Sequence, residues 1–161
     1  MNIRPAGQKD LSEIQRLNQQ IFDYEIAQCA PPGWNANHPY EKEGIEYFTK
    51  AIENDDGYAG FVYEKDDQIV AYVILRQIPD KELPHRNDIK LIQLHTFCVT
   101  NDYRGQGIGQ EMVAFAKEWA QEKGATHLKV VAMAGNALAR SVYQKCGFEE
   151  FEVTYEMAVT E

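Results

Sequence analysis

The sequence has few of the residues that mark disulfide-rich or metal-binding proteins. Its 161 residues include three cysteines, Cys29, Cys98 and Cys146, and none belongs to a Cys-x-x-Cys pair. An odd number of cysteines without such a pair predicts neither a disulfide framework nor a zinc site. The four histidines are scattered along the chain without the spacing of ligands. We therefore expect no bound metal.

Positive charge and long apolar segments are scarce as well. Sixteen Lys and Arg residues stand against 25 Asp and Glu residues, which gives a net charge of −9. This balance argues against nucleic acid or an anionic membrane as a partner. No apolar run approaches the roughly 20 residues of a membrane-spanning helix, and the first residues lack the apolar stretch of a signal peptide. We expect a cytoplasmic protein with no nucleic-acid or membrane partner.

Hydrophobic periodicity predicts one α/β domain over residues 1–161. Apolar residues at helical spacing predict helices around residues 11–22, 45–52, 108–123 and 136–146. Runs rich in β-branched and aromatic residues predict strands at residues 58–64, 68–78, 91–99 and 126–132. Apolar residues at alternate positions from Phe151 to Val159 predict a final half-buried strand. This order of elements predicts a mixed, twisted β-sheet flanked by helices.

The segment from Tyr103 to Gln110 joins the strand at 91–99 to the following helix through alternate glycines, Gly105, Gly107 and Gly109. Glycines allow positive φ values and leave the main chain open to a ligand. Successive N–H groups in such a turn, together with the first turn of a helix, bind anions such as a diphosphate. The segment lacks the lysine of a Walker loop and the final glycine of a dinucleotide fingerprint. We therefore expect a phosphate loop of another kind.

Two segments resemble one family. Residues 104–109, Arg-Gly-Gln-Gly-Ile-Gly, are similar to the (Gln/Arg)-x-x-Gly-x-(Gly/Ala) loop of the GNAT superfamily of acyl-CoA-dependent N-acyltransferases. Residues 136–148 resemble its Asn-x-x-Ala-x-x-x-Tyr-x-x-x-Gly-Phe segment. The resemblance implies a GNAT-like mixed sheet that splays at the acyl-CoA site, and a single N-acetyltransferase domain over residues 1–161 with acetyl-CoA as co-substrate.

The resemblance also implies which residues hold coenzyme A. The diphosphate is expected on the main chain of the glycine-rich loop, at Arg104, Gly105, Gln106, Gly107, Ile108, Gly109 and Gln110. The pantetheine arm is expected along the main chain of Phe97, Cys98 and Val99, where the N–H of Cys98 or Val99 would face the thioester oxygen. Asn136 is expected to hydrogen-bond the pantetheine arm, although an N-terminal helix cap explains an Asn at this place equally well.

Proton transfer needs an acid for the departing thiolate and a base for the amine. Tyr143 lies two helical turns after Asn136, and the resemblance implies that its phenol donates to the sulfur of coenzyme A. Many family members carry a Glu in the strand before the loop, where this chain has none, and His95 is our candidate base. Strand alternation places His95 on one side with Gln93 and Phe97. Glu25 and Asp23 are the alternatives.

The resemblance implies acetyl transfer from acetyl-CoA to a primary amine of a small molecule or a protein, directly in a ternary complex. The alternative is a non-catalytic acyl-CoA-binding regulatory module. The acceptor is expected to contact residues 23–40 and 79–88, where Trp34, Tyr24, Tyr40, His38 and Glu25 offer aromatic and acidic groups. A homodimer, with the final strand paired to another subunit, is a further possibility.

Overall fold

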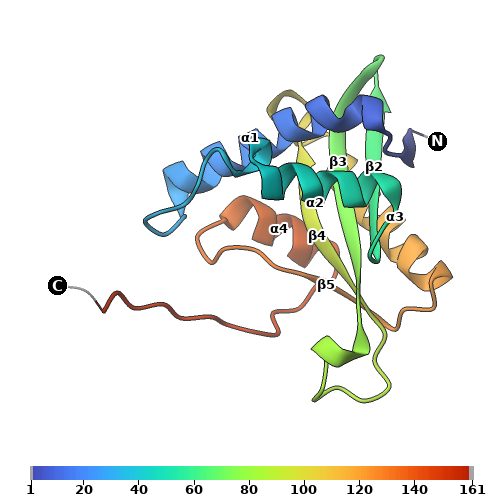
Figure 1. The fold of residues 1–161 in the computed structure, drawn as a ribbon, viewed down its shortest axis with the longest axis vertical. Coiled ribbons are helices and arrows are strands. Elements are labelled where there is room, and N and C mark those ends of the chain that lie inside the picture. Colours follow the sequence, from blue (N-terminus) through green and yellow to red (C-terminus); the bar gives the residue numbers. More distant parts are fainter. Residues whose placement is uncertain (1, 160–161) are drawn as a thin grey trace.

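The computed structural model describes residues 2–159 and places a five-stranded sheet between helices (Figure 1). The strands are β1 (Ile3–Pro5), β2 (Tyr58–Lys65), β3 (Gln68–Ile78), β4 (Leu91–Val99) and β5 (His127–Val130), in this order across the sheet. The helices are α1 (Leu11–Gln28), α2 (Lys42–Glu53), α3 (Ile108–Glu122) and α4 (Ala137–Lys145). Neighbouring strands are antiparallel except β4 and β5, which are parallel. The predicted mixed α/β sheet is confirmed.

Helices cover both faces of the sheet (Figure 1). One face of the sheet packs against α3, in a cluster that includes Phe61, Val73, Leu75, Leu94 and Met112. The other face packs against α1 and α2, in a cluster that includes Leu17, Phe48, Val62, Tyr72 and Ile74. The run from Val70 to Leu75 is therefore buried on both sides, which explains why it is continuously apolar. No helix within residues 2–159 is both long and apolar enough to cross a membrane.

An extra residue interrupts β4 in its middle. Thr96 lies opposite Ile74 of β3, whereas Leu94 lies opposite Leu75, so His95 is a bulge residue without a β3 partner of its own. The bulge shifts the alternation by one position. Phe97 packs with the core on the α3 side, as Leu94 does, whereas His95 contacts Tyr47 of α2. The prediction that His95 and Phe97 share a side is wrong for this reason.

The parallel ladder between β4 and β5 is short. It begins at Leu91 opposite His127 and ends at Leu94 opposite Val130. β4 continues to Val99 along β3, but the chain after Val130 turns away toward α4. The two strands therefore separate beyond Leu94, which confirms the predicted splay.

The prediction of a final strand at residues 151–159 is wrong for the single chain. No residue from Phe148 to Val159 is in a helix or strand, and the side chain of Tyr155 is 90% exposed. Figure 1 shows the C-terminal segment extending away from the helices and the sheet. A strand needs a neighbour to accept and donate its ladder hydrogen bonds, and within the described chain this segment has none.

Candidate functional site

The glycine-rich loop lies between β4 and the first turn of α3. Gly105 and Gly107 have φ values of 76° and 86°, in the left-handed region that favours glycine. A Cβ atom built on either residue would meet no atom within 4 Å. The backbone conformation, and not a lack of space, therefore requires glycine at both positions.

The loop presents consecutive backbone donors that the protein itself does not use. In residues 2–159, the N–H groups from Gly105 to Gly109 donate to no acceptor, whereas the N–H of Gln110 donates to the carbonyl of Gly107 at 2.9 Å. These groups open the N-terminus of α3, where the helix dipole adds positive potential. The arrangement can bind an anion, and the Gln110 N–H is less available for it than its neighbours.

Side chains around the loop hold it to the sheet. The Nε of Arg104 donates to the carbonyl oxygen of Val99 at 3.0 Å, which ties the loop to the end of β4. Lys65, at the end of β2, donates to the Oε1 of Gln106 at 2.8 Å. Sequence reasoning missed Lys65, because only the fold brings this cation from the β2–β3 hairpin beside the loop.

The ladder hydrogen bonds decide which amide groups of β4 face the splay. Thr100 N–H donates to the carbonyl of Val70 at 2.9 Å, and strand alternation then directs the N–H of Cys98 toward β3 as well. The N–H groups of Phe97 and Val99 point to the opposite edge, where β5 has already separated. The Val99 carbonyl, which accepts from Arg104, also faces away from β3.

A cavity of about 500 Å³ lies where β4 and β5 separate. Helices α1, α2 and α4 complete its walls, and among its described lining residues Glu25 is the only carboxylate and there is no Lys or Arg. The cavity brings together Tyr143, His95, Glu25, Asn136 and Phe97. Asp23 is not among the lining residues; it is exposed and accepts a hydrogen bond from Gln19.

The predicted acceptor segments contribute unequally to this cavity. Trp34 and His38 line it, whereas Tyr24 and Tyr40 do not. Residues 79–88 lie elsewhere, and a separate hollow includes several of them. Helix α2, which lies outside the two predicted segments, supplies Tyr47 and Phe48.

Asn136 and Tyr143 come from α4. The Oδ1 of Asn136 accepts the N–H of Ala139 at 3.0 Å, so this buried residue is the N-terminal cap of the helix. Tyr143 is half-buried, with its ring edge-on to Phe148. Burial and the nearby negative charge of Glu25 raise the pKa of Tyr143, so its phenol stays protonated at neutral pH. It is therefore a hydrogen-bond donor.

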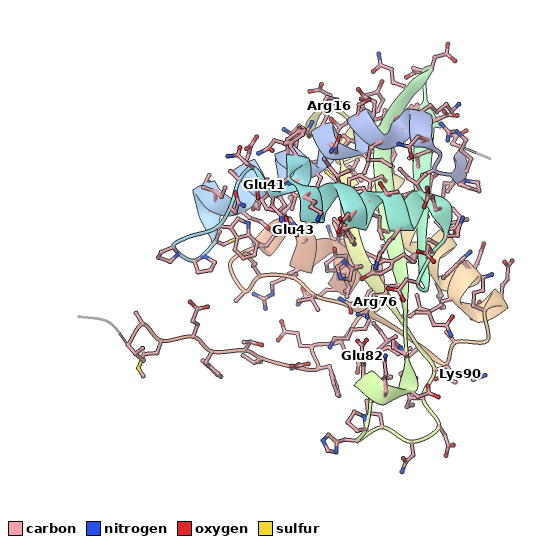
Figure 2. All side chains as sticks on the ribbon, viewed as in Figure 1. Arg16, Glu41, Glu43, Arg76, Glu82 and Lys90 are labelled. Atoms are coloured by element: carbon pink, nitrogen blue, oxygen red, sulfur yellow. The ribbon has the colours of Figure 1, made fainter. Side chains whose placement is uncertain are left out.

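His95 belongs to a small hydrogen-bonded group on the α2 side of the cavity. The hydroxyl of Tyr47 lies 2.9 Å from its Nδ1 and 2.5 Å from the Oγ1 of Thr96. Partial burial and the charge of Arg76 lower the pKa of His95, which favours the neutral imidazole. Arg76 itself pairs with Glu82 at 2.7 Å (Figure 2). Sequence reasoning missed Thr96 because a bulge leaves no periodic signal, and it missed Tyr47 because only the packing of α2 on the sheet brings this residue to β4.

Glu25 lies near the end of α1 and faces α4. Burial raises the pKa of its carboxyl group, and the nearby side-chain amide of Asn136 opposes this rise. A cationic ligand in the cavity would favour the charged carboxylate further, because an opposite charge stabilises it. Glu25 therefore offers a site for one ammonium group.

Comparison with known proteins gives one consistent family. A family model described as "Acetyltransferase (GNAT) family" matches residues 20–148 of this chain. "N-acetyltransferase family 8 member 2" of Rattus norvegicus is 32% identical over 102 residues, which are 63% of this chain and 43% of that protein. "Streptothricin acetyltransferase" of Escherichia coli is 26% identical over 133 residues, 81% of this chain and 68% of that protein. The chain thus spans less than half the length of the first of these relatives.

Solved structures show the same fold. A mutant of the BH1408 protein from Bacillus halodurans superposes with a TM-score of 0.80 at 21% identity, covering 99% of this chain and 100% of that one. A predicted acetyltransferase from Clostridium acetobutylicum, solved with acetyl-CoA, superposes with a TM-score of 0.75 at 23% identity, covering 98% of this chain and 96% of that one.

Replacing Gly107 tests whether the loop binds coenzyme A. In Gly107→Ala the backbone of an alanine must adopt the left-handed conformation, at a cost of about 1–2 kcal/mol, or the loop must change shape. A change in shape redirects the amide groups, and we expect about tenfold weaker binding of coenzyme A. Calorimetric titration of the folded variant measures it.

Gly124→Ala is the matched control. Gly124 follows α3 at its other end, has a φ of 72° and likewise has no atom within 4 Å of a built Cβ. Thermal unfolding should show a similar loss of stability in both variants, but Gly124→Ala should keep the affinity for coenzyme A. Unchanged affinity in Gly107→Ala would contradict the assignment of the loop.

Proposed function

This chain belongs to the GNAT acetyltransferase family, and we propose that it transfers an acetyl group from acetyl-CoA to a primary amine in a ternary complex. The observation that supports it most is the run of unused N–H groups from Gly105 to Gly109. This run lies next to the splay, because a Cβ on Gly109 would contact Phe97 of β4 and Val142 of α4 at 3.7 Å. Anion-binding groups and a cavity with a proton donor are therefore adjacent.

Coenzyme A fits this arrangement with its diphosphate at the glycine-rich loop and its pantetheine arm running toward the cavity. Its diphosphate binds the amide groups of the loop, with the cation of Lys65 nearby. Its pantetheine arm then follows the open edge of β4, where Phe97 and Val99 offer N–H groups. One of these two groups stabilises the negative charge on the thioester oxygen. The ladder favours Val99 over Cys98 for this role, because the Cys98 N–H faces β3.

The reaction needs two proton transfers. The amine nitrogen attacks the thioester carbonyl carbon, and the tetrahedral intermediate then breaks its carbon–sulfur bond. Tyr143 donates a hydrogen bond to the leaving thiolate, whose parent thiol has a pKa of about 8.5, well below that of the buried phenol. The phenol therefore keeps its own proton while it stabilises the charge on sulfur, and the thiolate takes its final proton from solvent.

His95 takes the proton of the amine, directly or through water. When its Nδ1–H donates to the Tyr47 oxygen and Tyr47 donates to Thr96, the Nε2 is left unprotonated and can accept a proton. The lowered pKa keeps this form populated at neutral pH. Glu25 is the alternative base, since it lines the same cavity.

The walls of the cavity favour an amine with one positive charge on an apolar body. Phe22, Trp34, Tyr47 and Phe48 supply aromatic surface, and Glu25 supplies the one carboxylate in the described lining. A polyamine or aminoglycoside would place further ammonium groups against aromatic walls without anions, at a desolvation cost. We therefore expect a monoamine with an aromatic or aliphatic body to be preferred.

An acceptor panel tests this function. The purified protein is titrated with acetyl-CoA by calorimetry and then offered 2-phenylethylamine, spermidine, an aminoglycoside and a lysine peptide while free thiol is followed. Fastest thiol release with 2-phenylethylamine is expected. Binding of acetyl-CoA without release on any amine would favour the non-catalytic acyl-CoA-binding module, and no binding would overturn both readings.

Glu25→Gln tests the acceptor site separately. Loss of one charged hydrogen bond should raise the KM for the amine by about 10- to 100-fold. The affinity for acetyl-CoA should not change, because the phosphate loop lies at the other end of the splay. A lower kcat with an unchanged KM would instead make Glu25 the base.

Tyr143→Phe removes the donor at sulfur but keeps the ring. We expect kcat to fall by about 10²- to 10⁴-fold, as for loss of a general acid, with coenzyme A affinity within about twofold. Tyr40→Phe, which removes a hydroxyl from an exposed tyrosine outside the cavity, is the control and should keep full activity. Equal turnover in Tyr143→Phe and the wild type would remove Tyr143 from the mechanism.

The pH profile tests His95. Its pKa is lowered from the usual 6.5, so kcat/KM should rise with pH below about 6.5 and level off above it. In His95→Gln this acidic limb should disappear and the plateau should be lower. His85→Gln, at an exposed residue outside the cavity, should keep the wild-type profile. An acidic limb of the same shape in His95→Gln would show that another group titrates.

A further inference from the structure

Asn18 is a buried polar residue in the α1 wall of the cavity, and the proposed reaction gives it no part. Only 4% of it is exposed, although it lies in the middle of a helix. Asparagine is a weak helix former, and burial of its amide costs free energy unless both ends of the amide are hydrogen-bonded. Both the oxygen and the nitrogen of this side chain therefore need a partner.

The oxygen of the Asn18 amide has a partner in the sheet. The hydroxyl of Tyr72, in β3, donates to the Oδ1 of Asn18 at 2.5 Å. Burial raises the pKa of Tyr72 well above its usual value, so the hydroxyl keeps its proton. The opposite amide orientation would leave this proton without an acceptor in the core, because the Tyr72 hydroxyl has no other partner in residues 2–159. Tyr72 therefore fixes the orientation of the amide.

The nitrogen of the same amide has no partner in the protein. Within residues 2–159 the Nδ2 of Asn18 donates to no acceptor. It is not sealed in the core either, because the Nε of Arg76 is the one fully covered side-chain nitrogen or oxygen in these residues that lacks a hydrogen bond. The Nδ2 is thus reached from open space, and Asn18 lines the cavity. The cavity therefore contains an unused hydrogen-bond donor.

Asn18 and Glu25 lie on the same face of α1. They are two helical turns apart, which is about 10 Å along the helix axis. Phe22 lies between them on this face and also lines the cavity. An acceptor with its ammonium group at Glu25 can therefore lie along the ring of Phe22 and present its other end to Asn18.

The chemistry of the cavity limits what this other end is. An amide nitrogen only donates, so the group that it binds must accept a hydrogen bond. The described lining includes no Lys or Arg, so a carboxylate or phosphate here would lose its water without gaining a cation, and Glu25 would repel it. A neutral oxygen, in a hydroxyl, ether or carbonyl group, has neither disadvantage.

We propose that Asn18 is a specificity-determining residue, which selects acceptor amines with a neutral oxygen at the end remote from the amino group. The inference rests on the proposed acetyl transfer for its reaction and narrows the class of acceptor. Tyramine has this chemistry, with its amine and its hydroxyl at opposite ends of one ring. It pairs the unused donor, whereas 2-phenylethylamine leaves the Nδ2 of Asn18 buried without an acceptor.

Binding of two amines that differ only in this oxygen tests the proposal. Tyramine and 2-phenylethylamine are titrated by calorimetry into the protein saturated with coenzyme A, so the measurement needs no turnover. One neutral hydrogen bond predicts that tyramine binds about 3- to 10-fold more tightly. Equal or weaker binding of tyramine would show that Asn18 pairs only with water, and would overturn the proposal.

A double variant removes the donor without stranding its partner. Asn18→Ala alone would leave the buried Tyr72 hydroxyl without an acceptor and destabilise the fold, whereas Asn18→Ala combined with Tyr72→Phe removes both groups. In the double variant the two amines should bind within about twofold of each other, because the hydrogen bond that separates them is gone. A preference for tyramine that persists would place the donor elsewhere and refute the assignment to Asn18.

Gln19→Ala is the matched control. It also removes an amide from α1, but Gln19 does not line the cavity, and its Nε2 donates to Asp23 at 2.9 Å. This variant should keep the wild-type preference for tyramine. Loss of the preference in the control as well would mean that α1 as a whole, and not the Asn18 amide, sets it.

Thiol release from acetyl-CoA separates this inference from the proposed function. Release with 2-phenylethylamine but no preference for tyramine would overturn the role of Asn18 and keep the acetyl transfer. A preference for tyramine in binding that the double variant loses, without thiol release on any amine, would contradict the transfer and support Asn18 as a binding residue.

Discussion

The geometry of the site depends on how β4 is hydrogen-bonded along its two edges. On one edge it pairs with β3 over its length, whereas on the other it pairs with β5 only from Leu91 to Leu94. The bulge at His95 stands at this boundary. Beyond it, the free edge offers N–H groups to a ligand and β5 leaves room for the cavity. A regular ladder would bury the same amide groups and close the space between the strands.

The surroundings of Tyr143 and His95 favour the neutral form of both side chains. Burial raises the pKa of Tyr143, and partial burial together with Arg76 lowers that of His95. At neutral pH the phenol therefore keeps its proton and the imidazole has a free lone pair. Burial thus moves the pKa values of the two groups apart, which is the condition for an acid and a base to act at one pH in the proposed reaction. In the proposed function, Glu25 binds the cation and the loop amides bind the anion.

The local features of the site could be predicted from sequence, and the relations between distant segments could not. The alternate glycines predict the loop, because few residues other than glycine adopt positive φ values. Asn136 is the N-terminal cap of α4, which is one of the two roles that the sequence predicted for it. The side of His95 was missed, since a bulge reverses alternation without changing composition. Lys65 and Tyr47 were missed because they reach the site only through the pairing of β2 with β3 and the packing of α2.

The C-terminal segment shows a different limit of prediction from sequence. Alternation between apolar and polar residues records that one face is buried somewhere, but it does not say in which molecule. The pattern from Phe151 to Val159 is as regular as that of a strand, yet no β-strand forms there in the single chain. The predicted helices and the strands of the sheet form within the described chain, and the side of His95 is the exception that the bulge explains. From Val153 to Val159 the apolar side chains are exposed, and an alternating pattern forms no strand where no neighbouring strand offers ladder hydrogen bonds.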